Sequence, residues 1–138
     1  MNSYRLLQLS LGLSYSFQVQ VSVQMLDQFE ILTGDANPLH KERDFAVQYG
    51  FRDRVSYGML TASFYSTLIG MYLPRKYALL QGVDVTFIAP VFPGDDLTIF
   101  GEIVSVHQTL KQIEIRAHIS NQFGKKVSRA KIRSGINE

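Results

Sequence analysis

The stretch that decides the fold is GMLTASFYSTLIGMY, residues 58–72. Leu60, Phe64 and Leu68 recur at helical spacing, and few of the remaining positions are polar. A helix that is apolar on nearly every side is predicted to be buried. It is much shorter than the ~20 apolar residues that span a bilayer, and Pro74 is expected to end it. We therefore predict a buried helix enclosed by the rest of the chain, and no membrane span.

Strand-like segments lie on both sides of this helix. Residues 14–23 alternate apolar and polar side chains, which is typical of a strand with one buried face. Four further strands are predicted after the helix, at residues 78–89, 97–107, 112–120 and 126–134. An early strand, then helices, then a run of antiparallel strands indicates an α+β fold. The expected architecture is an antiparallel β-sheet wrapped around a long central helix, in one domain covering residues 1–138.

The segment between the first strand and the buried helix has mixed signals. Residues 24–33 show helical spacing, and Gly34 is a stop signal after them. Residues 34–43 are rich in turn formers and are predicted to be a loop. A short helix is expected over residues 44–49 with Asp44 as its N-cap.

Composition limits the function classes. Charged residues make up 19% of the chain, below the usual quarter of a soluble domain, so part of the surface is expected to be buried in a homodimer or larger homo-oligomer. A net charge of +2 is too small to indicate a nucleic-acid-binding protein. Basic residues do alternate over residues 125–133, which favours the solvent face of a strand, although such a cluster can also attract phosphates.

The absence of cysteine excludes disulfides, thiolate catalysis and cysteine-ligated metals. The three histidines, at positions 40, 107 and 118, lack the spacing of a helical zinc motif, so no metal or cofactor is expected. Residues 1–13 contain a short apolar run after Arg5, but polar residues interrupt it and no convincing cleavage site follows. We expect a cytoplasmic protein.

The loop TGDANPLH, residues 33–40, carries a carboxylate and an imidazole five residues apart. Pro38 fixes its own φ and restricts Asn37, so the loop is expected to be stiff. Asp35 and His40 converging on one water molecule would orient it and remove its proton. The alternative is ordinary turn chemistry, with Asp35 and Asn37 bonded to the local backbone. Spacing alone favours that alternative.

The second segment is SYGML, residues 56–60, where the buried helix begins. Backbone N–H groups at a helix start lack partners within the helix, and the helix dipole is positive there. Gly58 would let a ligand approach closely, and its N–H would stabilise the oxygen of a thioester carbonyl. Gly58 acting only in packing is an equally good interpretation of the glycine by itself.

Taken together, GDANPLH, YGMLTASFYSTLIG and PVFPGDDL resemble the MaoC-like (R)-specific enoyl-CoA hydratase/dehydratase family over about residues 15–134. The resemblance implies the hot-dog fold and reversible hydration of a trans-2-enoyl thioester to an (R)-3-hydroxyacyl thioester. It implies that Asp35 and His40 activate the water and that the Gly58 N–H binds the substrate oxygen. No cofactor is implied beyond the coenzyme A or acyl carrier of the substrate.

The resemblance also implies a set of residues that contact substrate. They are Asn37, which would hold the loop, Met59 beside Gly58, and Ser66 on the buried helix, whose hydroxyl is as well explained by a bond to the helix backbone. The chain departs from the family pattern at Tyr57, where the family usually has histidine. Tyr57 is expected to reshape the acyl pocket or its entrance.

Two other functions remain open at this point. A hot-dog thioesterase would direct its activated water at the carbonyl carbon instead of Cβ. A non-catalytic domain would only bind acyl thioesters, and Tyr57 mildly favours it, whereas an intact Asp35 and His40 argue against it.

Overall fold

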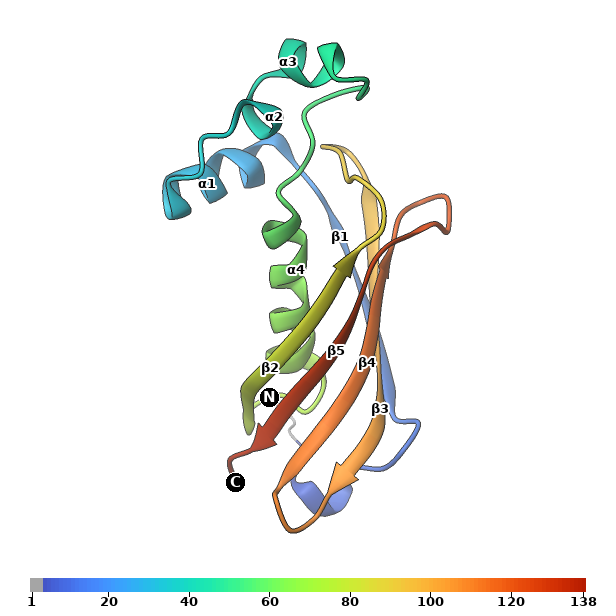
Figure 1. The fold of residues 1–138 in the computed structure, drawn as a ribbon. Helices are drawn as coiled ribbons and strands as arrows, with labels where there is room; N and C mark the ends of the chain where they lie inside the picture. Colours follow the sequence, from blue (N-terminus) through green and yellow to red (C-terminus); the bar gives the residue numbers. More distant parts are fainter. Residues whose placement is uncertain (1–3) are drawn as a thin grey trace.

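The computed structural model describes residues 4–138. Residues 1–3, at the start of the N-terminal segment discussed above, lie outside the described residues. Figure 1 shows a sheet curling around one helix, with the helices of residues 23–48 at one end and both termini near the other. The strands, in the sheet order β1-β3-β4-β5-β2, are β1 (Ser14–Gln20), β3 (Asp96–His107), β4 (Gln112–Ser120), β5 (Lys126–Ile136) and β2 (Ala78–Phe87). The helices are η1 (Leu6–Gln8), α1 (Val23–Thr33), α2 (Pro38–Lys41), α3 (Arg43–Gln48), α4 (Gly58–Thr67) and η2 (Leu68–Tyr72). The α+β prediction of a sheet around one helix is confirmed.

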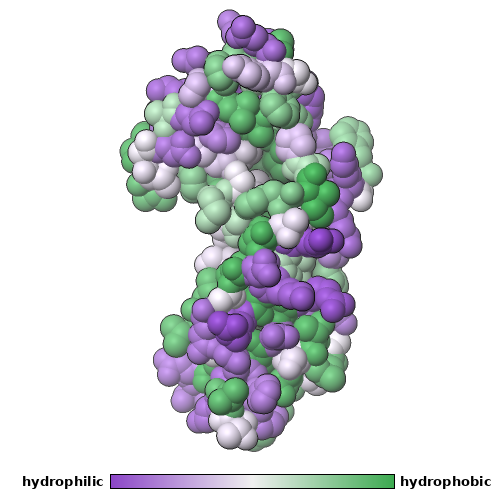
Figure 2. Space-filling model, viewed as in Figure 1, coloured by the Kyte–Doolittle hydropathy of each residue, from purple (hydrophilic) through white to green (hydrophobic). Residues whose placement is uncertain are grey.

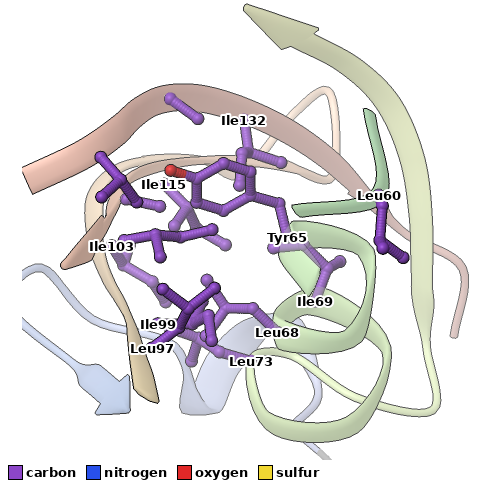
Figure 3. Close-up of a cluster of buried hydrophobic side chains, with 14 of the residues drawn as sticks. Leu60, Tyr65, Leu68, Ile69, Leu73, Leu97, Ile99, Ile103, Ile115 and Ile132 are labelled. Carbon is purple, nitrogen blue, oxygen red and sulfur yellow. The ribbon is translucent and has the colours of Figure 1, made fainter. Parts of the chain in front are cut away.

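The central helix α4 approaches the sheet closely because the sheet is lined with small residues beneath it. Gly101 on β3 pairs with Ala117 on β4, which in turn pairs with Ala130 on β5. A Cβ at Gly101 would lie 2.5 Å from a methyl carbon of Leu68, so only glycine leaves room for that side chain. The core fills around this row with fully buried side chains from α4, η2 and the strands, as Figure 3 shows: Tyr65, Leu68, Ile69, Ile99, Ile103, Ile115 and Ile132.

The prediction that the 58–72 helix is buried on all sides is wrong. Met59 and Met71 are 67% and 53% exposed, and Ser63 and Ser66 are also exposed. Among residues 4–138, these four side chains stay exposed, whereas Leu60, Tyr65, Leu68 and Ile69 are buried. The helix also changes to π-helical turns over η2, beyond which Leu73 and Pro74 end it as expected.

The strands match their predicted positions, with differences at the ends. The isoleucine and alanine side chains of β4 alternate along the strand and are all buried. The first strand ends at Gln20 instead of residue 23, because the Ser22 hydroxyl accepts a hydrogen bond from the Met25 N–H and starts α1. The fifth strand continues to Ile136 because its end pairs with the beginning of β2 at Ala78.

The segment before α4, residues 23–48, forms a helical cap at one end of the sheet (Figure 1). Its first helix ends at Gly34, which adopts a left-handed φ of 78° as the stop signal predicted. Residues 34–43 are not all loop, since Asn37 caps the short helix α2 and Pro38 occupies its first turn. Asp44 is not an N-cap: α3 begins one residue earlier, with Glu42 as its N-cap, and Asp44 lies in the first turn.

The outer face of β5 carries Lys126, Arg129, Lys131 and Arg133, all exposed, which confirms the solvent-face interpretation of the C-terminal basic residues. Figure 2 shows hydrophilic side chains over this part of the sheet. Between residues 4 and 138, no helix is long and apolar enough to cross a membrane.

Candidate active site

The cap and the beginning of α4 enclose a hollow of about 580 Å³. Five of the residues predicted from the sequence line it together: Asp35, His40, Tyr57, Gly58 and Met59. The remaining lining residues, which the sequence reasoning missed, are Phe29, Thr33 and Phe87. The structure therefore brings a carboxylate and an imidazole from residues 33–40 and the N-terminus of α4 to one cavity.

His40 is held in a defined orientation. Its Nδ1 lies 2.7 Å from the backbone carbonyl oxygen of Val55. Because a carbonyl oxygen only accepts hydrogen bonds, Nδ1 carries the proton and donates it. In the neutral ring this leaves Nε2 as the unprotonated nitrogen, which is the arrangement that a general base requires.

Asp35 lies in a turn whose geometry comes from the residues around it. The Asp35 N–H donates to the Thr33 hydroxyl at 3.2 Å, and its carboxylate oxygen Oδ1 accepts from the Asn37 N–H at 3.2 Å. Asn37 in turn accepts from the Leu39 N–H at 3.0 Å and so caps α2. The local turn bonds expected for Asp35 and Asn37 are thus present, yet the Asp35 side chain still lines the hollow.

Tyr57 connects the two candidate catalytic residues. Its hydroxyl donates to the backbone carbonyl of Asp35 at 2.5 Å, and its ring stacks on the His40 ring with centroids 4.1 Å apart. Phe29 packs against the same ring, at 4.7 Å between centroids, and Tyr57 is only 3% exposed. Burial, followed by the negative charges of Asp35 and Glu30, raises the pKa of the Tyr57 phenol, which keeps it a neutral donor at physiological pH.

The N–H of Gly58 opens α4, where no preceding turn supplies an acceptor. Within the part of the chain that the structure describes, no acceptor is found for it. A Cβ on Gly58 would lie 3.1 Å from two carbon atoms of the Phe87 ring, so glycine is also needed for the contact with β2. Both interpretations of Gly58, close approach and packing, have support in the geometry.

Arg54 was missed by the sequence reasoning although it holds His40 in place. Its Nε donates to the His40 backbone carbonyl at 2.8 Å, while Nη2 donates to Asp27 of α1 at 2.8 Å. The Arg54 side chain is only 14% exposed. An arginine in an irregular loop carries no local signal for this role, because both of its partners are distant in sequence.

A second anchor of the cap is the buried carboxylate of Asp95, in the turn between β2 and β3. Its Oδ1 accepts from Arg52 and from Gln122, both at 2.9 Å, and its Oδ2 accepts from the Phe92 N–H at 2.9 Å. Its backbone carbonyl accepts from the Val21 N–H at 2.9 Å. Residues on both sides of the cap, Val21 before α1 and Arg52 after α3, therefore meet at Asp95.

A family profile described as MaoC like domain matches residues 10–126. The chain belongs to the MaoC-like family. The (R)-specific enoyl-CoA hydratase of Aeromonas caviae is 34% identical over 96 residues, which cover 70% of this chain and 72% of that protein. The 3-hydroxybutyryl-CoA dehydratase of Methylorubrum extorquens is 31% identical over 98 residues, covering 71% of this chain and 62% of that protein.

Solved structures of MaoC-like relatives superimpose over nearly the whole chain. The unliganded R-hydratase PhaJ1 of Pseudomonas aeruginosa has a TM-score of 0.92 at 25% identity, covering 99% of this chain and 87% of that one. The (R)-hydratase of A. caviae, described as involved in PHA biosynthesis, has a TM-score of 0.89 at 27% identity, covering 93% and 97%. The hot-dog fold predicted from the sequence is confirmed.

Ser66 lies apart from the other candidates in this MaoC-like chain. It is exposed on α4, two turns beyond Gly58, and it is not among the residues that line the hollow. Across residues 4–138, no group of three or more histidine, aspartate or glutamate side chains is arranged to hold a metal ion.

Proposed function

We propose that this protein is a hydratase/dehydratase that adds water reversibly to a trans-2-enoyl thioester, giving an (R)-3-hydroxyacyl thioester. The proposal is supported by the MaoC-like family and by the relatives whose names describe this reaction. The observation that carries it is the geometry of His40. With Nδ1–H donated to Val55, the ring presents an unprotonated nitrogen in a hollow shared with Asp35 and Gly58.

The proposed mechanism uses water as the only co-reactant. Asp35 and His40 orient one water molecule, and its oxygen forms a bond to Cβ of the enoyl chain while its proton passes to the catalytic pair. The electron pair of the C=C bond moves toward the thioester, and the carbonyl oxygen becomes negative. The Gly58 N–H, with the positive end of the α4 dipole, stabilises that oxygen. A proton then returns to Cα, which completes the addition.

The hydrogen bond from the Gly58 N–H stabilises the transition state more than the bound substrate. A hydrogen bond from Gly58 strengthens as charge develops on the oxygen, so it lowers the barrier instead of only tightening binding. Asn37 acts in this scheme by holding the Asp35 turn through α2, and Met59 and Tyr57 shape the walls of the hollow. Coenzyme A or an acyl carrier enters as part of the substrate, and we propose that no separate cofactor or metal takes part.

The decisive experiment follows enoyl-thioester absorbance with crotonyl-CoA, for the wild type and for Asp35→Asn. The wild type should lose absorbance without releasing free thiol, and the variant should lose at least about a hundredfold in kcat/KM, about 2.7 kcal/mol of transition-state stabilisation. Loss of the enoyl-thioester band accompanied by an equal release of free thiol would indicate a thioesterase. Binding without either signal would indicate a non-catalytic acyl-thioester domain. Full activity in Asp35→Asn would refute the assigned pair.

We also propose that the chain forms a homodimer through β2. This strand lies at the edge of the sheet and exposes Leu79, Leu80 and Val83. An exposed apolar edge is a template for pairing with another strand, and Met59 on α4 and Met71 on η2 are further exposed apolar side chains. Light scattering should give the mass of two chains, and Val83→Lys should shift it toward one; a wild-type monomer at working concentration would refute the proposal.

A cytoplasmic location is likewise proposed, to be checked by fractionating cells that express the tagged protein.

A further inference from the structure

The outer face of the sheet carries an uneven share of the charge of the chain. Residues 111–133 contain seven of its fourteen lysines and arginines but only one of its twelve acidic residues. Five of these cations are exposed on β4 and β5, and they are here called the basic face: Arg116, Lys126, Arg129, Lys131 and Arg133. They form a positive surface on a chain whose net charge is only +2.

The basic face is not neutralised from within the chain. Arg116 on β4 lies directly opposite Lys131 on β5, and like charges in that position destabilise a sheet. Asp84 on β2 lies opposite Lys131 on its other side, yet none of the five cations forms an ion pair with a residue between 4 and 138. Repelling cations that stay side by side break a local rule of stability, and such positions are expected where function requires them.

A hollow of about 530 Å³ lies between these side chains. Its charged and polar walls come from three neighbouring strands: Asp84, Thr86, Arg116, His118, Lys126, Arg129 and Lys131. Four of the five cations of the basic face therefore surround one hollow, in which only a single carboxylate opposes them. Such a site attracts an anionic group and disfavours a cationic one.

The spacing of the cations fits an acidic helix better than a single phosphate. Arg129, Lys131 and Arg133 alternate along β5, so that neighbours in this row are about 6.6 Å apart. Carboxylates four residues apart on a helix are about 6 Å apart, which lets the two rows run side by side. From Lys126 to Arg133 the row is about 20 Å long, the length of about fourteen helical residues. One phosphate group would reach only part of it.

The basic face begins beside the candidate active site. Arg129 lies opposite Thr86 on β2, and the next residue of that strand, Phe87, lines the hollow that contains Asp35 and Gly58. Side chains alternate along a strand, so β2 passes from the outer face to the catalytic hollow within one residue. A partner bound on the outer face would thus hold a flexible arm close enough to pass around the end of β2.

We propose that the basic face binds an acidic helix of an acyl carrier protein, which presents the enoyl thioester to the candidate active site on its phosphopantetheine arm. The inference rests on the proposed function and selects a carrier protein over coenzyme A as the form of the substrate. The carboxylates of the carrier neutralise the repelling cations, and their long-range attraction speeds the encounter of the two proteins.

The test compares one acyl group on three carriers, as crotonyl-pantetheine, crotonyl-CoA and a crotonyl-loaded bacterial acyl carrier protein. The wild type should hydrate the carrier-protein form with the highest kcat/KM, and raising the salt from about 50 to about 300 mM should reduce this advantage. The double variant Arg129→Gln/Lys131→Gln should lower kcat/KM for the carrier-protein form about tenfold through KM. Crotonyl-CoA and crotonyl-pantetheine should stay within about twofold.

The matched control is Arg5→Gln/Lys76→Gln, which removes one arginine and one lysine from exposed positions away from the basic face. It should change none of the three rates. A loss of the same size in this control would show that only net charge matters and would overturn the proposal. An equal loss for crotonyl-CoA and the carrier-protein form would assign the basic face to nucleotide phosphates and overturn it as well. An unchanged carrier-protein rate in Arg129→Gln/Lys131→Gln would also overturn it.

Calorimetric binding of the unloaded carrier protein separates these results from a failure of the proposed function. Binding that Arg129→Gln/Lys131→Gln weakens about tenfold would support the docking surface even if no enoyl thioester were hydrated. Absence of binding at about 50 mM salt would overturn the proposal. If phosphatidylserine vesicles instead bound the wild type and not the variant, the basic face would be assigned to a membrane surface.

Discussion

Tyr57→Phe isolates the hydroxyl that joins the two candidate catalytic residues. The substitution keeps the ring that stacks on His40 and Phe29 and removes only the bond to the Asp35 carbonyl. A hydrogen bond of this kind contributes about 0.5–1.5 kcal/mol net. Because Asp35 lies in an exposed turn, water can replace the lost donor, and the free energy of unfolding should fall by about 1 kcal/mol.

The effect on catalysis follows from the same number. If the hydrogen bond, by positioning Asp35, stabilises the transition state by about 1 kcal/mol, kcat of the Tyr57→Phe variant should fall about fivefold while KM changes little. The phenol stays neutral well above pH 8, since burial and the nearby carboxylates raise its pKa. The wild-type advantage over the variant should therefore be constant from pH 7 to 9 and disappear only at higher pH, where the hydroxyl ionises.

The assay combines steady-state hydration of an enoyl-CoA with thermal unfolding of the same samples. Tyr49→Phe is the control, because it deletes a hydroxyl from a tyrosine that is 65% exposed and whose ring packs at a tilt against Phe45. It should change neither the rate nor the unfolding temperature. A Tyr57→Phe enzyme with reduced stability but full kcat would refute the positioning role, because it would show that the bond to Asp35 is only structural.

Tyr57→His restores the residue usual in the family and adds a group that titrates near neutral pH, so its rate profile should gain an acidic limb.

Three further outcomes are expected. Arg54→Gln removes the charged donor to the His40 carbonyl, so the free energy of unfolding should fall by about 1 kcal/mol and kcat should also fall. Arg43→Gln is the control, because Arg43 forms only a 3.8 Å surface pair with Asp53, and it should change neither quantity. Equal effects of the two substitutions would show that charge and not position matters. Burial and then Lys126 lower the pKa of His118, so the unfolded chain binds protons first and stability should decline as pH falls below about 6.5. Urea unfolding of His118→Gln at pH 7.5 and 5 should show a smaller decline, and an identical decline would contradict this. Burial raises the pKa of Tyr65 to about 12, so its hydrogen bond to Ser128 is lost only in strong alkali. The free energy of unfolding of the wild type should therefore fall between about pH 10 and 12. Tyr65→Phe should lack that part of the fall, and unfolding curves at pH 9 and 11 would reveal the difference.

The fold was predictable because its signals are local and periodic. The alternation in residues 112–120 and the apolar stretch of residues 58–72 each identify an element without reference to any other. The exposure of part of the 58–72 helix was not predictable from the same residues. Met59 and Met71 look like core residues in sequence, yet both are exposed, Met59 on α4 and Met71 on η2. Sequence composition does not say whether an apolar side chain packs inside its own chain or against another.

The candidate site was predictable where a motif is contiguous. Asp35 and His40 belong to one loop, and the structure places both in one hollow with Gly58. Arg54 and Phe87 were missed because their roles depend on neighbours far away in the chain, the His40 carbonyl and Gly58. Short helices were also misjudged, since α2 depends on capping by Asn37 within a segment of turn-forming residues.

Asp95 has a consequence for how the cap opens. One buried carboxylate residue binds the chain just before α1, through Val21, and just after α3, through Arg52. Release of Arg52 takes a charged partner from the buried Asp95 carboxylate, and release of Val21 takes the hydrogen bond from the Asp95 backbone carbonyl. Because both bonds meet at one residue, the two ends are expected to detach together. In hydrogen exchange, the amides of α1 and α3 should then share one opening free energy and behave as a single cooperative unit. Such a cap exchanges between two states, closed and open, instead of fraying gradually from either end.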